Sequence, residues 1–318
     1  DRLYAAHIRN CRLWTAHNFR VSTGGVASTA TGNRNGTRWY ELQNLNTTPT
    51  VVQSGTVFDS TATNPKHYWI PSIMVSGQGH AAMGFSAAGN TTAASAAYTG
   101  RLAGDSAGAM QAPTIYAAGA GNYNPPADPG GTSGRRWGDY SYTSLDPNDD
   151  MTFWTIQEFN DSLNSYGVRI VKLSPPPPAT PSSASASVQA GGPAVNVVVT
   201  GVSSSGSGFF DPGAGFANRI AASVSGTGVT VNSITYDSPT QVTLNISATA
   251  GAAAGARTIT VTNPDGQTAT SATAILTIAP KDADHFVVRA TDRILAGVEQ
   301  PDFEITVSRR PPAPGVKK

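Results

Sequence analysis

The chain has 318 residues, a formal net charge of +1 and 13% charged residues, about half the roughly 25% of an average soluble protein. This length is enough for two or three domains. The near-zero net charge offers no electrostatic footprint for nucleic acid or an anionic membrane, and no apolar run approaches the ~20 residues of a membrane span. We therefore expect no nucleic-acid partner and no membrane insertion.

Charged residues are scarce, whereas Gly (33) and Pro (22) are frequent. Such a chain keeps itself soluble through hydroxyl groups and backbone, as exported β-rich proteins often do, so we expect an extracellular or cell-surface location. The single cysteine, Cys11, excludes an internal disulfide and a cysteine-based zinc cluster. We expect Cys11 to be a small buried apolar residue.

From the N-terminus to residue 174, short strand-like runs alternate with turns rich in Gly, Asn, Asp and Pro, and helical periodicity is almost absent. The runs form groups of about four. They are 2–10, 11–21, 36–45 and 49–59 in the first group; 68–76, 80–88, 95–103 and 112–119 in the second; and 139–147, 151–159 and 166–174 in the third. The third group is one strand short.

Four-stranded antiparallel units that repeat every ~40–55 residues are typical of β-propeller blades. Five tryptophans in or beside the runs would fill the wedges between blades: Trp14, Trp39, Trp69, Trp137 and Trp154. Because a ring needs about four to eight blades, we expect further blades to precede Asp1 or to come from a partner chain, and we favour a piece of a longer protein.

The run "SPPPPATPSS" separates two regions of different sequence pattern. Its four consecutive prolines have no backbone N–H to donate to a sheet. We expect a Pro-rich linker over 175–183. Residues 184–279 then contain six short alternating strands, which indicate an immunoglobulin-like β-sandwich without the Cys…Trp…Cys core. Its turn "NPDGQ" (263–267) is well specified by Pro264 and Gly266.

The tail, 280–318, contains two more strand-like runs and ends in the basic, Pro-rich "RRPPAPGVKK". It would add edge strands or begin a truncated module. The predicted fold class is thus all-β: a partial β-propeller of about three four-stranded blades (1–174) plus an immunoglobulin-like sandwich.

Two resemblances accompany these patterns. The stretch "GVTVNSITYDSPTQVTLNISATAGAAAGARTITVTNPDGQTATSATAILTI" (228–278) resembles the IPT/TIG family of immunoglobulin-like modules in bacterial secreted proteins. The segments "LWTAHN", "RWYEL", "YWIPSI", "GRLAGD" and "RWGDYS…DPNDDMTFWTIQEF" resemble the C-terminal blades of bacterial sialidase-like or BNR-repeat propellers. These resemblances imply a bacterial, secreted protein, and they supply no reaction.

The acidic segment "DPNDD" (146–150) has three interpretations. It could contribute carboxylates to a glycosidase site together with Asp139 and Glu158, but the arginines of a sialidase cannot be assembled from this chain. It could bind calcium through Asp146, Asn148, Asp149 and Asp150, although it lacks EF-hand spacing. We favour a blade turn like an Asp-box, in which Asp146 locks the turn and Trp154 fills the core.

Aromatic and basic side chains suggest a glycan-binding surface as an alternative to core packing. The candidates are Trp39, Trp69, Arg136 and Trp137. The five histidines share no metal-ligand spacing, so calcium is the one cofactor considered.

Three functions follow for comparison. We favour a non-enzymatic surface protein for adhesion, which would bind a glycan or a surface protein. The second is the C-terminal part of a secreted glycan hydrolase whose catalytic residues lie upstream. The third is a structural subunit of a surface filament, in which copies of the chain pair with one another.

Overall fold

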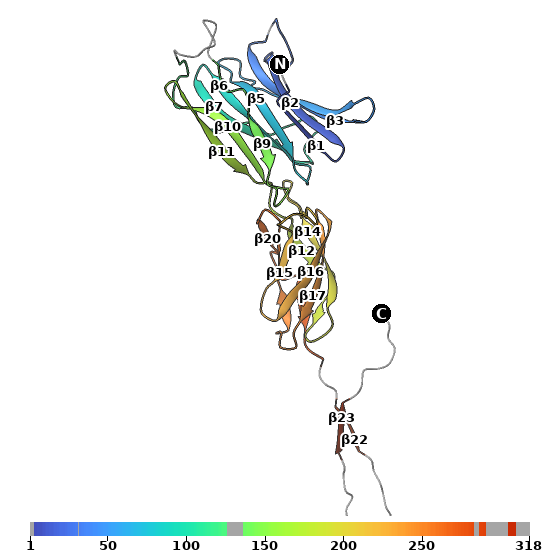
Figure 1. The fold of residues 1–318 in the computed structure, drawn as a ribbon. Helices are drawn as coiled ribbons and strands as arrows, with labels where there is room; N and C mark the ends of the chain where they lie inside the picture. The colour runs from blue at the N-terminus through green and yellow to red at the C-terminus, as the bar shows by residue number, and fades with distance from the viewer. Residues whose placement is uncertain (1–2, 31, 126–135, 283–285, 291–304, 310–318) are drawn as a thin grey trace, which may run out of the picture.

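The computed structural model describes residues 3–30, 32–125, 136–282, 286–290 and 305–309. Throughout these residues the chain is all-β and built from several antiparallel sheets, as its sequence predicts. No described residue belongs to a helix long and apolar enough to cross a membrane. Figure 1 shows one body containing β1–β11, a second containing β12–β21, and a separate hairpin.

The first body contains three sheets whose strands follow one another in chain order. The first sheet is β1 (Ala5–Arg9), β2 (Arg12–Val21), β3 (Arg34–Gln43) and β4 (Thr50–Val57). The second sheet is β5 (His67–Val75), β6 (Ala81–Gly89), β7 (Thr92–Arg101) and β8 (Thr114–Ala117). The third sheet is β9 (Tyr142–Leu145), β10 (Phe153–Ser162) and β11 (Ser165–Leu173). This grouping, including the strand missing from the third sheet, matches the sequence prediction.

The first and second sheets pack face to face through an apolar core. Trp14 and Trp39 stack at 5.5 Å with an interplanar angle of 11°, and both are buried against side chains of the second sheet such as Ile73 and Phe85. Burying rings of this size is the largest single apolar contribution available to a core. Trp14 and Trp39 therefore serve the packing role expected of them.

The second and third sheets meet through small and polar residues. Gly84 of β6 faces Thr155 and Gln157 of β10, and a Cβ at Gly84 would lie 2.1 Å from Thr155 Oγ1. Thr143 of β9 donates from its backbone N–H to Ser72 Oγ at 2.8 Å and from its hydroxyl to Ser72 O at 2.9 Å. The absence of a side chain at Gly84 thus permits a close, hydrogen-bonded approach of the two sheets.

The second body encloses one apolar core that includes Val197, Leu244, Ile259 and Ile278. A four-stranded sheet contains β12 (Thr180–Ala184), β14 (Val195–Val202), β17 (Gln241–Ala248) and β16 (Val229–Ser238). The opposite strands are β13 (Val188–Gln189), β21 (Leu276–Ala279) and β18 (Gly255–Arg257), then β15 (Ala221–Val224), β19 (Ile259–Thr262) and β20 (Thr268–Thr270). In the tail, β22 (Phe286–Ala290) pairs with β23 (Ile305–Arg309), and 310–318 lie outside the described residues.

The proline-rich segment is packed between the two bodies. Pro175 and Pro178 are buried, Gln267 Nε2 donates to Pro175 O at 2.8 Å, and Gly208 N donates to Pro177 O at 3.2 Å. Strand β12 already begins at Thr180, inside the range that the sequence assigned to the linker. Prolines at the start of an edge strand remain compatible with pairing, because the ladder does not need their missing N–H.

A second contact joins all three sheets to the second body. Arg9, at the end of β1, forms a bidentate ion pair with Asp150, whose backbone oxygen accepts a hydrogen bond from Gly77 N at 3.0 Å. A Cβ at Gly77 would lie 2.5 Å from Cζ of Phe210, which belongs to the second body. The bodies also share a hydrogen bond from Asn218 N to Asn148 O at 2.9 Å.

Cys11 differs from its sequence prediction, because it is exposed. Asn10 (φ 49°) and Cys11 (φ 58°) form the two-residue loop between β1 and β2, where Arg9 pairs with Arg12. A two-residue hairpin of this kind needs positive φ at both positions, which turns the side chain at position 11 toward solvent.

Replacing Cys11 with Gly is expected to raise the free energy of unfolding by about 0.5 kcal/mol, because Gly adopts positive φ without steric cost and completes an Asn–Gly turn. Urea unfolding of Cys11→Gly beside Cys11→Ala measures the effect. Equal stability of the two variants would contradict the proposed backbone cause.

Candidate functional site

The acidic turn before β10 uses Asp146 as a lock. Asp146 Oδ1 accepts the backbone N–H of Asn148 at 3.0 Å, and Oδ2 accepts Nε1 of Trp154 at 3.1 Å. These bonds, led by the one from the Asn148 backbone, hold the pKa of Asp146 below its usual range. The turn role expected for Asp146 is confirmed.

The neighbouring carboxylates have different partners. Asp149 accepts hydrogen bonds from the backbone N–H groups of Met151 and Thr152 at 2.8 and 2.9 Å, and from the Thr152 hydroxyl at 2.7 Å. Asp150 pairs with Arg9. Among the described residues no three His, Cys, Asp or Glu side chains gather as metal ligands. Three of the four expected calcium ligands, Asp146, Asp149 and Asp150, are therefore not gathered as a metal-binding group, and the fourth, Asn148, donates from its side-chain amide to Asp146 at 2.9 Å.

Trp154 is not a core residue, which corrects the sequence prediction. Its side chain is 38% exposed, while Phe153, Thr155 and Gln157 on the alternate positions of β10 are buried. Strand periodicity requires that every second residue of β10 is buried, but it does not determine which set. The hydrogen bond of Trp154 to Asp146 and the packing of Phe153 bury the face opposite to the expected one.

Two of the four glycan candidates lie together at one end of the first body. Trp69 of β5 and Trp137 meet edge to face with ring centroids 6.5 Å apart, and Tyr123 meets Trp137 at 5.1 Å with an interplanar angle of 89°. Trp137 Nε1 also donates to Ser86 Oγ at 3.2 Å, which fixes the indole. We call Trp69, Trp137 and Tyr123 the aromatic corner.

Two hollows adjoin the aromatic corner, and Trp69 and Asn35 line both. One has a volume of about 290 Å³ and the other about 430 Å³. Their remaining side chains are mostly polar. They include Tyr4, Asn18, Asp139, His67 and Asn90. Partly buried indole rings beside amides and a carboxylate offer a stacking surface together with hydrogen-bonding groups.

The backbone beside Trp69 is strained. Ile70 is buried and has φ 53°, a conformation that is an outlier for a β-branched residue, and the β5–β6 register shifts between Trp69 and Ser72. The Ile70 N–H donates to Asn18 Oδ1 at 3.1 Å, which ties this bulge to the first sheet. A β-bulge with backbone strain is a common way to aim a side chain at a functional site.

The other two candidates occupy different environments. Trp39 is fully buried, so its placement removes it from any set of glycan contacts. Arg136 is exposed and pairs with Asp139 at 3.2 Å. Beneath this pair, Glu158 accepts a backbone hydrogen bond from Gly138; burial raises the pKa of Glu158, and the nearby charge of Asp139 adds to the effect.

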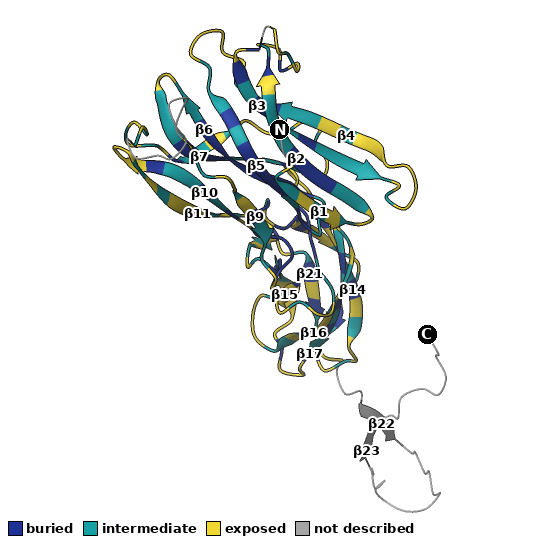
Figure 2. Cartoon of the chain, turned by 45° about the horizontal axis from the view of Figure 1, so that its top comes forward, coloured by how far each residue is buried: buried dark blue, intermediate teal, exposed yellow. Residues whose placement is uncertain are grey.

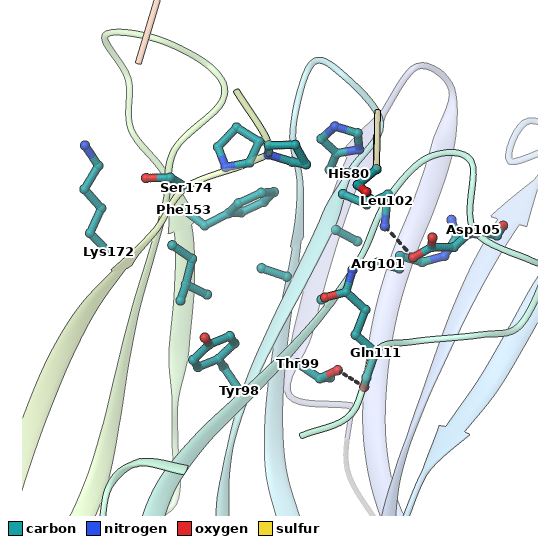
Figure 3. A pocket seen from close by; sticks show the side chains of 17 residues that line it. His80, Tyr98, Thr99, Arg101, Leu102, Asp105, Gln111, Phe153, Lys172 and Ser174 are labelled. Atoms are coloured by element: carbon teal, nitrogen blue, oxygen red, sulfur yellow. Dashed lines mark hydrogen bonds between the residues drawn. The ribbon is translucent and has the colours of Figure 1, made fainter. Parts of the chain in front are cut away.

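A larger cavity of about 700 Å³ lies where the second and third sheets meet the second body (Figure 3). Tyr98, Phe153 and Leu102 supply apolar walls, and Lys172 and Ser174 stand at the side of β11. His80, which is buried, accepts a hydrogen bond at Nδ1 from the backbone N–H of Ala103 at 2.9 Å. The histidine thus supports the loop that borders this cavity.

Acid is expected to destabilise the protein through His80. Burial lowers the pKa of His80, and Arg101 lowers it further against an opposing effect of Asp105. The stability it contributes is therefore complete above pH 6.5 and is lost as the pH falls below that value. Thermal unfolding between about pH 7.5 and about pH 5 measures the loss.

His7, His17 and His67 also have lowered pKa values and add to the same trend. Asn at position 80 can still accept the Ala103 N–H through its side-chain oxygen. His80→Asn should therefore weaken the pH dependence, and an unchanged dependence would contradict a role for His80.

Sequence reasoning missed Tyr123 as a member of the aromatic corner, and Asn18, Asn35 and His67 as its neighbours. No local signal could have identified them, because they come from four separate segments of the chain. No protein-family model, curated protein or solved structure matches this chain.

Proposed function

We propose that the chain is a non-enzymatic extracellular or cell-surface protein that binds a glycan at the aromatic corner. The observation that carries this proposal is the pair Trp69 and Trp137 beside two polar hollows, aimed by the strained bulge at Ile70. Sugar rings present C–H faces that stack on indoles, and their hydroxyl groups pair with amides and carboxylates. Few formal charges and the resemblance to secreted modules support the location.

The fold that accompanies this proposal is a β-propeller segment followed by an immunoglobulin-like sandwich of the IPT/TIG kind. Its support is the chain-ordered meander of each of the three sheets in the first body, the face-to-face packing of these sheets, and the single apolar core of the second body. An experimental structure in which the three sheets radiate from a common axis would support the propeller; sheets stacked without such an axis would contradict it.

Replacing Trp69 or Trp137 with Ala is expected to weaken glycan binding by about tenfold or more, because the loss of one stacked ring costs at least about 1.4 kcal/mol. A glycan array identifies the ligand, and titration calorimetry measures both variants. Trp154→Ala is the matched control, since this tryptophan is exposed on another face. Equal binding by all three variants would exclude the aromatic corner.

A secreted glycan hydrolase is the second candidate, and Glu158 is the observation that favours it. A carboxyl group with a raised pKa beside a second carboxylate, Asp139, is an arrangement that general acids use. Glycan hydrolysis that disappears in Glu158→Gln would replace the binding proposal. The third candidate function, a structural subunit, would use surfaces of the chain other than the aromatic corner.

A further inference from the structure

The third sheet presents a largely apolar face to solvent. Five of its large hydrophobic side chains are exposed, and they occupy alternate positions of its strands. They are Tyr142 (63%), Trp154 (38%), Tyr166 (58%), Val168 (58%) and Ile170 (60%). Ile156 pairs directly with both Ile170 and Tyr142, so the three side chains form a ladder across the sheet. We call these residues the third-sheet outer face.

The inner face of the same sheet mixes polar and apolar side chains. Thr143, Thr155 and Gln157, each about 1% exposed, face the second sheet together with Phe153, which is also buried. An antiparallel sheet with one solvated side normally turns its apolar side inward. Exposed apolar surface costs about 25 cal/mol per Å², and contiguous patches of this kind mark interaction surfaces. The exposed apolar side chains of the third sheet therefore indicate that its outer face is covered in the functional state.

The opposite end of the three-sheet stack carries a similar feature. Ile8, Leu13, Leu42 and Val51 are directly paired across all four strands of the first sheet, on the face turned away from the second sheet. Ile8 is 66% and Val51 56% exposed. We call the face that carries this ladder the first-sheet outer face. Figure 2 shows exposed segments on β1 and β4.

Charge also differs between the two outer faces. On the third-sheet outer face, Glu158 pairs with Val168 and lies next to the ladder, and Lys172 pairs with Trp154 at the other end. On the first-sheet outer face, Arg38 pairs with His17, and its guanidinium lies 4.7 Å from the centroid of the Phe19 ring. Each face thus offers an apolar ladder with charged neighbours: Glu158 and Lys172 at the two ends of one ladder, and Arg38 beside the other.

We propose that the third-sheet outer face binds the first-sheet outer face of a second copy of this chain. Within one chain the first sheet packs on the second and the second on the third, so a copy added in this way continues the same face-to-face stacking. The two ladders bury each other, and Glu158 meets Arg38. The aromatic corner belongs to neither ladder, so the two activities are measured separately, although the surfaces adjoin at Glu158, which accepts a hydrogen bond from Gly138 beside Trp137.

Contact between two different faces is heterologous, so each copy retains one free face of each kind until the assembly closes. Two copies form a closed dimer if the third-sheet outer face of each copy binds the first-sheet outer face of the other. Otherwise further copies add to the free faces and the assembly extends as a filament. The assembly is therefore expected to contain whole multiples of the 32.7 kDa chain.

Sedimentation velocity of the full chain over a range of concentrations tests the proposal. The wild type should form species larger than 32.7 kDa, whereas Ile170→Lys and Ile8→Lys should each remain monomeric. Val202→Lys is the matched control, since Val202 is 60% exposed on β14 of the other body and should leave association unchanged. Circular dichroism of each variant verifies that it is folded.

A mixture of the two variants identifies the geometry. Ile8→Lys retains an intact third-sheet outer face and Ile170→Lys an intact first-sheet outer face, so the mixture should recover a dimer that neither variant forms alone. Association that survives in Ile8→Lys but not in Ile170→Lys would show pairing between identical faces and overturn the proposal. A wild type that remains monomeric at all concentrations would overturn it as well, without affecting glycan binding.

Discussion

Replacement of Arg9 by Met is expected to lower the free energy of unfolding by about 3–5 kcal/mol, because it leaves a buried carboxylate without its counter-charge. The side chain of Asp150 is only 5% exposed and receives both guanidinium nitrogens of Arg9. The same contact joins the first, second and third sheets and lies against Phe210. Chemical denaturation measures the loss.

Two further variants separate burial from charge. Adding Asp150→Asn to Arg9→Met removes the unpaired charge, and Asn tolerates the positive φ (55°) at this position, so the double variant should recover part of the loss. Arg136→Met breaks an exposed pair, 66% and 53% accessible, and should cost less than about 1 kcal/mol. Equal losses for Arg9→Met and Arg136→Met would contradict the importance of burial.

Replacement of Gly84 by Val should destabilise the protein by about 3 kcal/mol or more, at the upper end of what overpacking causes. A Cβ at this position would lie 2.1 Å from Thr155 Oγ1 and 2.3 Å from Gln157 Nε2, and both side chains are held within the buried interface. The second and third sheets would have to separate. Thermal unfolding measures the effect.

Gly104→Val is the control for Gly84→Val, since no atom lies within 4 Å of a Cβ at Gly104 and its φ is not in the left-handed region. It should change stability by less than about 0.5 kcal/mol. A Gly84→Val variant as stable as Gly104→Val would show that the two sheets do not depend on this close approach.

Strand periodicity and turn residues predicted much of the fold. The three strand groups of the first body follow from short runs separated by turns, and the "NPDGQ" turn forms as expected, with Gly266 at φ 87° and its N–H bonded to Asn263 O at 2.9 Å. Both features depend on interactions between residues close in sequence, which is why a sequence pattern is sufficient to identify them.

Features that depend on distant contacts were not predicted. The alternation in β10 indicates two faces but not which one is buried, and the third sheet buries Thr155 and Gln157 in place of Trp154 because Gly84 leaves room for them. Trp69 and Trp137 are 68 positions apart, so only the packed sheets reveal that they meet. Cys11 is a different case, because its exposure follows from the local two-residue turn between β1 and β2, which the sequence prediction overlooked.

The buried prolines between the two bodies have a mechanical consequence. A segment that crosses between two bodies through free solvent lets them rotate, whereas here Pro175 and Pro178 are buried and the carbonyl oxygens of Pro175 and Pro177 accept hydrogen bonds from the second body. Tension applied at the C-terminal end would therefore act on this contact between the two bodies and on the Arg9–Asp150 ion pair together, and it would not simply extend a flexible linker. The two bodies would behave as one rigid unit, so the attachment of the C-terminal end would set the orientation of the aromatic corner.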